Sequence, residues 1–218
     1  MSHAAAAALP VGVFGGTFNP VHYGHLRSAL ELVERLGLEQ LRLMPCAVPP
    51  HRELPTCSAE HRCAMVELAV AGEPRLLCDA RELHRTGKSF SIDSLIELRA
   101  ELGEQRSLCL VMGCDALLGI TGWHRWRELL DWAHIVVIAR PGWELPAAGE
   151  VAEWLSSHCL SAASALRQRP AGGILVEELR PLQISSTEIR QMIAAGHSPR
   201  YLLPEPVLGY IHRHKLYQ

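Results

Sequence analysis

The sequence of 218 residues has no apolar run close to the ~20 residues that would cross a bilayer. Its first ten residues, MSHAAAAALP, lack the cationic and apolar regions of a signal peptide. We therefore expect a cytoplasmic protein with no membrane partner, and residues 1–9 as a frayed leader. An excess of positive charge is also missing, because 21 Lys and Arg face 23 Asp and Glu for a net charge of −2. This balance argues against nucleic acid as a partner.

The seven cysteines include no pair at C-x-x-C spacing. Zinc ribbons and thioredoxin-type sites are therefore not indicated. The best metal candidate, Cys57 with His61 and Cys63, lacks a close fourth ligand, so we assign no residue to a metal site. All seven cysteines are expected to be reduced thiols, as in cytosolic proteins.

Short apolar segments alternate with helical patterns, in a chain that is 48% hydrophobic and 20% charged. The spacing predicts strands over residues 11–14, 41–44, 75–78, 107–112, 134–139 and 174–177, and helices over 25–36, 58–71, 91–102 and 185–195. This alternation predicts a single α/β domain, 1–218, with a doubly wound, Rossmann-like parallel sheet flanked by helices. A small C-terminal helical part is expected from about 180 to 218. Residues 141–173 show no clear periodicity.

The first notable motif, GGTFNPVHYGH, covers residues 15–25, directly after the first expected strand. Ligands bind at the carboxyl ends of strands in such sheets. The paired glycines allow the backbone to approach a ligand, and the helix that follows presents free N–H groups to a phosphate. His22 and His25 can both face that phosphate. A β–α turn with two surface histidines is the simpler alternative. No Walker A loop and no G-x-G-x-x-G are present, so NAD as a redox cofactor is not supported.

The second motif, ISSTEIR, covers residues 184–190 and opens an expected helix. Ser185 or Ser186 can cap that helix, and Glu188 is at capping-box distance from Ser185. Capping is the structural alternative to a binding role. The same free N–H groups suit an anion, and the Arg190 fork can hold two phosphate oxygens at once.

The first motif resembles the G-G-x-F-D-P-x-H-x-G-H signature of HxGH-class nucleotidyltransferases, and the second resembles I-S-S-T-x-[IL]-R of adenylyltransferases in that class. Asn19 stands where the class commonly has Asp, which affects only a role that needs a carboxylate. The segments PPHR at 49–52, TGKSFSIDSL at 86–95 and GCDAL at 113–117 resemble the bacterial nicotinate-mononucleotide adenylyltransferase family. The likeness runs from residue 11 to about 210, with Arg52 for the usual Lys and Phe90 for Tyr.

The resemblance implies transfer of the adenylyl group of ATP to nicotinate mononucleotide, giving deamido-NAD and pyrophosphate in NAD biosynthesis. Mg²⁺ would accompany ATP as cofactor, and no nucleophilic side chain is needed because the substrate supplies the attacking phosphate oxygen. The implied catalytic residues are His22, His25 and Arg190. The implied ATP-binding residues are Gly15, Gly16, Thr17, Phe18, His25, Gly113, Asp115, Arg140, Ser185, Ser186 and Arg190. The implied mononucleotide-binding residues are Asn19, Arg52, Thr86, Gly87 and Trp123.

Several alternatives stay open at this point. Asp115 could be a helix N-cap, and Trp123 could be a half-buried packing residue. Nicotinamide mononucleotide or phosphopantetheine could be the acceptor, and a regulatory module could bind nucleotide without turnover. We expect a preference for nicotinate, with its carboxylate on backbone N–H groups near Thr86 and Gly87 while the ring stacks on Trp123. A homo-oligomer is compatible with the sequence.

Overall fold

The six strands form one parallel sheet in the order β3-β2-β1-β4-β5-β6. The computed structural model describes residues 8–48, 55–180 and 182–218. The strands are β1 (Val11–Gly16), β2 (Gln40–Pro45), β3 (Leu76–Cys78), β4 (Leu108–Gly113), β5 (His134–Ala139) and β6 (Ile174–Glu178). All six expected strands and the Rossmann-like parallel sheet are therefore confirmed. Chain order reverses between β1 and β4, which is where such folds bind ligands.

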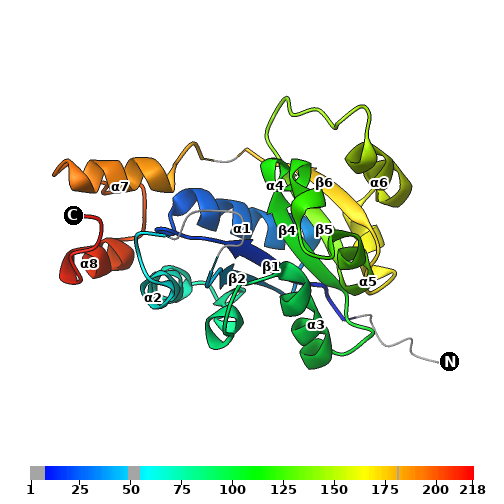
Figure 1. Ribbon diagram of the computed structural model, residues 1–218, viewed down its shortest axis with the longest axis horizontal. Coiled ribbons are helices and arrows are strands. Elements are labelled where there is room, and N and C mark those ends of the chain that lie inside the picture. Colours follow the sequence, from blue (N-terminus) through cyan, green and yellow to red (C-terminus); the bar gives the residue numbers. More distant parts are fainter. Residues whose placement is uncertain (1–7, 49–54, 181) are drawn as a thin grey trace.

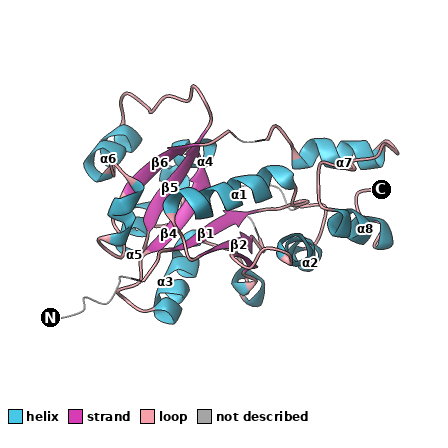
Figure 2. Ribbon diagram, turned by 180° about the vertical axis from the view of Figure 1, so that it is seen from behind, coloured by secondary structure: helices cyan, strands magenta, loops and turns pink. Residues whose placement is uncertain are grey.

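Helices cover both faces of this sheet (Figures 1 and 2). They are α1 (Tyr23–Leu36), α2 (Ala59–Val70), α3 (Ser91–Leu102), α4 (Cys114–Leu118), α5 (Leu129–Trp132), α6 (Glu150–His158), α7 (Ser186–Ala194) and α8 (Glu205–Arg213). One core layer joins the sheet to α1, α2 and α8, and the other joins it to α3, α4, α5 and α6. Strand β4 supplies both layers because Leu110 and Val111 point to opposite faces. None of the described helices combines the length and apolar character needed to cross a bilayer.

Local signals in the sequence set the helix ends. Gly37 ends α1 with φ of 60°, a left-handed conformation that glycine adopts without a Cβ penalty. Ser58 starts α2 by accepting a hydrogen bond from the His61 N–H. The residues without clear periodicity, 141–173, contain α6. Of the nine residues of α6, all of them described, only Leu155 is buried, so the helix leaves little apolar pattern in the sequence.

Helices α7 and α8 lie outside the sheet, on the side toward which β1 leads (Figure 1). Strand β6 ends at Glu178 and α7 begins at Ser186, so an irregular connection brings the second motif across to the first. The Ser186 hydroxyl donates to the Pro20 carbonyl at 2.9 Å, across 166 residues of sequence. The fold therefore joins the two motifs at the carboxyl end of β1.

Candidate active site

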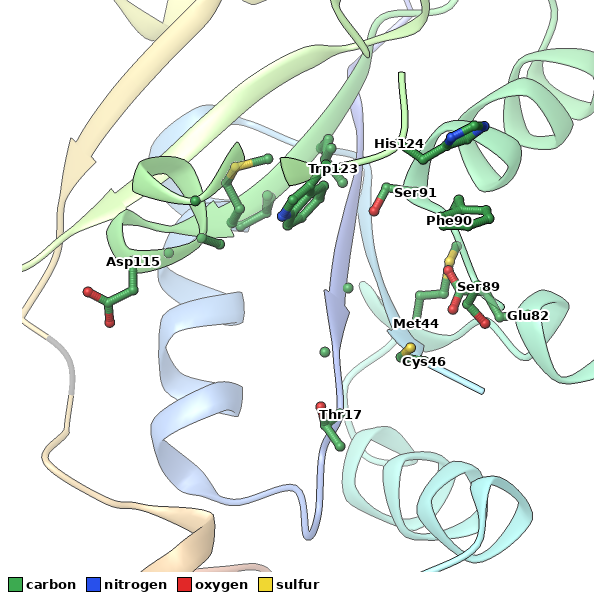
Figure 3. Close-up of a pocket in the computed structure, with 18 of the residues that line it drawn as sticks. Thr17, Met44, Cys46, Glu82, Ser89, Phe90, Ser91, Asp115, Trp123 and His124 are labelled. Carbon is green, nitrogen blue, oxygen red and sulfur yellow. The ribbon is translucent and has the colours of Figure 1, made fainter. Parts of the chain in front are cut away.

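Two cavities meet at the carboxyl end of β1. Gly15, Gly16 and Thr17 line both of them. The first, here named the Trp123 cavity, has a volume of about 380 Å³ and extends between β1, β4, α3 and α4 (Figure 3). The second, here named the Arg190 cavity, has a volume of about 410 Å³ and lies between the β1–α1 turn and the start of α7. One backbone segment thus borders two spaces that are each large enough for part of a nucleotide.

The β1–α1 turn depends on its glycines. A Cβ on Gly16 would lie 2.8 Å from the ring of Phe18, which is buried and has φ of 47°. That ring packs edge-on against His25 at 5.1 Å between centroids. A Cβ on Gly15 would meet no other atom within 4 Å, so the backbone is open to a ligand on that side. Glycine at position 16 therefore allows the Phe18 ring to pack against the backbone, whereas glycine at position 15 leaves the backbone open to a ligand.

His22 and His25 stack with their ring centroids 3.8 Å apart. His22 is the N-cap residue of α1 but makes no side-chain capping bond, and a Cβ on Gly24 would lie 2.9 Å from its Nδ1. Burial lowers the pKa of His22 to about 4; burial and the neighbouring His22 lower the pKa of His25 to about 3. Both imidazoles are therefore neutral near pH 7 without ligand.

The Nδ1 atoms of both histidines are buried and have no hydrogen-bond partner among the described residues. Buried polar atoms without partners are costly and rare in proteins. His25 lines the Arg190 cavity, so its ring can contact a ligand there. His22 stacks on the His25 ring and thereby restricts the orientation of that ring.

Arg190 and the start of α7 line the same cavity as His25. Arg190 Nη1 donates to the Asn19 carbonyl at 2.7 Å, and Nη2 lies 3.4 Å from Thr187 Oγ1. Ser185 caps α7 by accepting from the Thr187 N–H, which confirms the capping alternative for this residue. Ser186 and Thr187 line the cavity together with Arg190. The helix N-terminus and the guanidinium give this cavity a positive wall suited to phosphate.

Asn19 is fixed by a residue that the sequence did not single out. The Tyr217 hydroxyl donates to Asn19 Oδ1 at 2.6 Å. Tyr217 is half-buried, and burial raises its phenol pKa, so it is a proton donor throughout the neutral range. Asn19 lines the Arg190 cavity rather than the Trp123 cavity. The class commonly has Asp at this position. Here the Tyr217 hydroxyl needs a hydrogen-bond acceptor, and the amide oxygen of Asn19 supplies one.

Arg62 is a second residue that the sequence did not single out. It is 1% exposed, and its guanidinium donates to the carbonyls of Thr17, Cys46 and Cys57 at 2.7, 2.6 and 3.3 Å. These carbonyls belong to the loops after β1 and β2 and to the residue before the α2 cap. Arg62 lies within α2, where i, i+4 spacing alone gives no sign that a charged side chain points inward. Arg62 thereby ties α2 to Thr17, which lines both cavities, and to Cys46, which lines the Trp123 cavity.

The Trp123 cavity has a different lining at each end (Figure 3). Asp115 lies at one end, and Glu82, Ser89, Phe90 and Ser91 lie at the other. Gly113 is the N-cap of α4 and Asp115 follows in its first turn, so the N-cap alternative for Asp115 is wrong.

Helix α3 begins at Ser91 inside the Trp123 cavity, and its N-cap Phe90 makes no side-chain capping bond. The first N–H groups of a helix have no intrahelical partner, so an anion can be held there. Burial raises the pKa of Glu82, which accepts from Ser94 Oγ at 2.9 Å. Ser91 was missed as a site residue, although it follows directly from the helix start that the sequence predicts.

The other predicted site residues fall into three groups. Phe18 lines the Arg190 cavity, and Gly113 and Trp123 line the Trp123 cavity. Thr86, Gly87, Arg140 and Ser185 are exposed and line neither cavity as the structure describes them. Thr86 and Gly87 lie in the bend between a 3-10 helix at Arg81–His84 and α3, before the chain turns inward. Arg52 lies outside the described residues.

Comparison with known proteins gives consistent results. A family described as cytidylyltransferase-like matches residues 13–192. A protein of Aeromonas salmonicida (strain A449), named "Probable nicotinate-nucleotide adenylyltransferase", is 48% identical over 209 residues, covering 96% of this chain and 97% of the relative. A protein of Pseudomonas putida (strain W619) with the same name is 50% identical over 214 residues, covering 98% and 97%.

A solved structure has a similar fold. It is the Plasmodium falciparum nicotinic acid mononucleotide adenylyltransferase complexed with NaAD, and its TM-score is 0.71. The match covers 96% of this chain and 97% of that chain at 15% sequence identity. At this identity the likeness shows the fold alone.

Proposed function

This chain belongs to the cytidylyltransferase-like family and to its nicotinate-nucleotide adenylyltransferases, and on that basis we propose that it transfers the adenylyl group of ATP to nicotinate mononucleotide. The products are nicotinate adenine dinucleotide and pyrophosphate, in NAD biosynthesis. The junction of two cavities at Gly15, Gly16 and Thr17 supports this function most directly. Two nucleotides that react through their phosphates need two spaces that meet where the phosphates react, and these two cavities share Gly15, Gly16 and Thr17 as lining.

The Arg190 cavity suits the leaving pyrophosphate. An oxygen of the mononucleotide 5′-phosphate forms a bond to the α-phosphorus of ATP, and the bond from that phosphorus to the bridging oxygen breaks. Negative charge then moves to the pyrophosphate. Arg190, the N-terminus of α7 and a neutral N–H of His25 would stabilise this charge, because all three line the same cavity. The chain itself supplies no nucleophile.

ATP-dependent nucleotidyl transfer generally uses a divalent cation, and we propose Mg²⁺ in this role. As far as the chain is described, no carboxylate lines the Arg190 cavity. Mg²⁺ often binds through phosphate oxygens and water rather than in an all-protein cage. The donor set therefore fits a cation that arrives with the triphosphate and screens its charge, with the hydroxyls of Thr17 and Ser186 nearby.

The Trp123 cavity suits the pyridine ring. Trp123 and Phe90 offer aromatic surfaces, and the start of α3 at Ser91 offers N–H groups and a hydroxyl to the nicotinate carboxylate. We therefore assign the carboxylate to Ser91 rather than to the exposed Thr86 and Gly87. An amide would bring its own donors toward these donors and leave some unpaired. Asp115, at the other end of the cavity, would accept from a ribose hydroxyl.

A substrate panel tests the function. Pyrophosphate release from ATP is measured with nicotinate mononucleotide, nicotinamide mononucleotide or phosphopantetheine as acceptor. We expect release that depends on a mononucleotide, with kcat/KM at least about tenfold higher for nicotinate. Equal values for the two mononucleotides would indicate dual specificity. Release with phosphopantetheine alone, or ATP binding without release, would overturn the proposal. A cytoplasmic location and a homo-oligomer stay predictions from the sequence.

A further inference from the structure

Cys63, Glu67 and Cys78 form a cluster away from both cavities. The two Sγ atoms lie 3.5 Å apart, and Cys63 Sγ lies 3.8 Å from Glu67 Oε1. The three ligand atoms all lie within 4.8 Å of one another. Cys63 is buried, Cys78 is half-buried and Glu67 is exposed, so the cluster lies at the edge of the molecule with solvent on one side. None of the three residues lines the Trp123 or Arg190 cavity.

The fold brings these three residues together from two elements. Cys63 and Glu67 are four residues apart in α2, which places them on one face of the helix. Cys78 is the last residue of β3, the edge strand against which α2 packs. The sequence analysis considered a different trio, Cys57 with His61 and Cys63, and assigned no metal to it. Among the described residues that trio does not form a ligand cluster, and His61 Nδ1 instead lies 2.9 Å from the Tyr210 hydroxyl.

We propose that Cys63, Cys78 and Glu67 bind a thiophilic divalent cation such as Zn²⁺, with water as the fourth ligand. Zinc bonds of ~2.3 Å to sulfur and ~2.1 Å to oxygen in a tetrahedron separate two sulfurs by about 3.8 Å and a sulfur from an oxygen by about 3.6 Å. The observed separations of 3.5 and 3.8 Å are both within about 0.3 Å of those values. The third separation, from Cys78 Sγ to the Glu67 carboxylate, is at most 4.8 Å, so rotation of the exposed Glu67 side chain would complete the tetrahedron.

The negative charges that the three ligands would carry also favour a bound cation. Two thiolates and a carboxylate this close together would repel one another, and a dication between them removes that repulsion. Binding converts two thiols to thiolates and releases up to two protons to solvent. A Cys63–Cys78 disulfide would not explain why the Glu67 carboxylate lies beside the sulfurs.

A cobalt titration tests the site on the full chain. The reduced, chelator-treated protein is titrated with Co²⁺, whose thiolate bonds give a charge-transfer absorption band, and Zn²⁺ is then added. We expect one equivalent of Co²⁺ to produce the band and Zn²⁺ to abolish it. Cys63→Ser and Cys78→Ser should each remove the band, and Glu67→Gln should weaken binding about tenfold. Cys159→Ser, which changes an exposed cysteine after α6, is the matched control and should bind normally.

A second readout covers the case in which a variant folds poorly. Zn²⁺ at about 100 times its Kd should raise the Tm of the wild-type chain by about 5–10 °C and leave that of Cys78→Ser unchanged. Absence of the band, its persistence in Cys78→Ser, or a Cys63–Cys78 disulfide that forms in its place would overturn the proposal. Pyrophosphate release by the zinc-free protein should match that of Cys78→Ser. This comparison separates failure of the cation site from failure of the proposed enzyme function.

Discussion

The His22–His25 pair has two buried Nδ1 atoms without partners among the described residues, and His25 lines a cavity suited to phosphate. We expect His25→Ala to lower kcat by ~10²–10³, with a smaller effect on the KM for the mononucleotide, because one preorganised donor to the leaving group is lost. His22→Ala should have a related effect through the position of the His25 ring. The double variant should lose less than the product of the two single losses. Pyrophosphate release measures all three, and an unchanged kcat in His25→Ala would exclude this residue from the reaction.

The Arg190 guanidinium binds the Asn19 carbonyl with one nitrogen and keeps others toward the cavity. Lysine cannot do both, because its ammonium is a single point charge on a flexible stem. We therefore expect Arg190→Lys to lower kcat/KM for ATP by at least about tenfold although the charge is kept. Steady-state kinetics with varied ATP would show this. Near-normal values would mean that Arg190 acts through its charge alone.

The Tyr217 hydroxyl holds Asn19, whose carbonyl in turn holds Arg190. Tyr217→Phe keeps the ring and removes the donor, and we expect kcat to fall about tenfold, since an unpaired buried group costs ~1–3 kcal/mol. Asn19→Asp keeps an acceptor and should retain activity, whereas Asn19→Ala should lose it. A thermal melt serves as the control for folding. Equal kcat values in Asn19→Asp and Asn19→Ala would contradict a role that depends on the acceptor.

At the scale of one element, we expect the start of α3 to select which pyridine is accepted. Ser91 contributes a hydroxyl at the point where the first helical N–H groups face the Trp123 cavity. We expect Ser91→Ala to lower kcat/KM for nicotinate mononucleotide about tenfold and to leave the value for nicotinamide mononucleotide nearly unchanged. Thr86→Ala, in the exposed bend before α3, is the matched control. An equal loss with both substrates would mean that Ser91 does not read the carboxylate.

The elements that the sequence predicted well have either continuous apolar runs or clear ends. Strands β4 and β5 are buried on both faces, and Gly37 ends α1 where the pattern stops. Contacts across the chain were not predictable. Arg62 points inward from a helix whose sequence allows it to point outward, and Tyr217 meets Asn19 across 198 residues. Thr86 and Gly87 were chosen because the segment TGKSFSIDSL resembles the family, but in the structure this segment lines the cavity at Ser89, Phe90 and Ser91. Motifs therefore located the site, while its geometry depended on tertiary contacts.

For the whole molecule, the buried histidines make stability depend on pH. In the folded chain the pKa is about 4 for His22 and about 3 for His25, whereas an unfolded histidine titrates near 6.5. Between pH 7 and pH 4 the unfolded chain binds more protons, so the free energy of unfolding falls as pH falls. The loss from pH 7 to pH 5 should be on the order of 1–2 kcal/mol per histidine. Urea unfolding at both pH values measures it.

The matched control for the pH dependence is the His22→Asn, His25→Asn double variant, which should show a shallower slope. A residual slope is expected because burial also lowers the pKa of His134. A wild-type free energy of unfolding that is unchanged between pH 7 and pH 5 would contradict the neutral, buried state of the pair.

The short segment of Gly15, Gly16 and Thr17 borders both cavities, and no neighbouring atom would meet a Cβ at Gly15. An inhibitor could therefore run along this backbone from one cavity to the other. A compound that links a pyrophosphate-like anion to a pyridine carboxylate would occupy both spaces as one molecule, so its second half would bind at a high effective concentration. The linker would lie along the backbone at Gly15, where there is no side chain to block it. The same open backbone that lets two substrates meet thus makes the enzyme accessible to a single bivalent ligand.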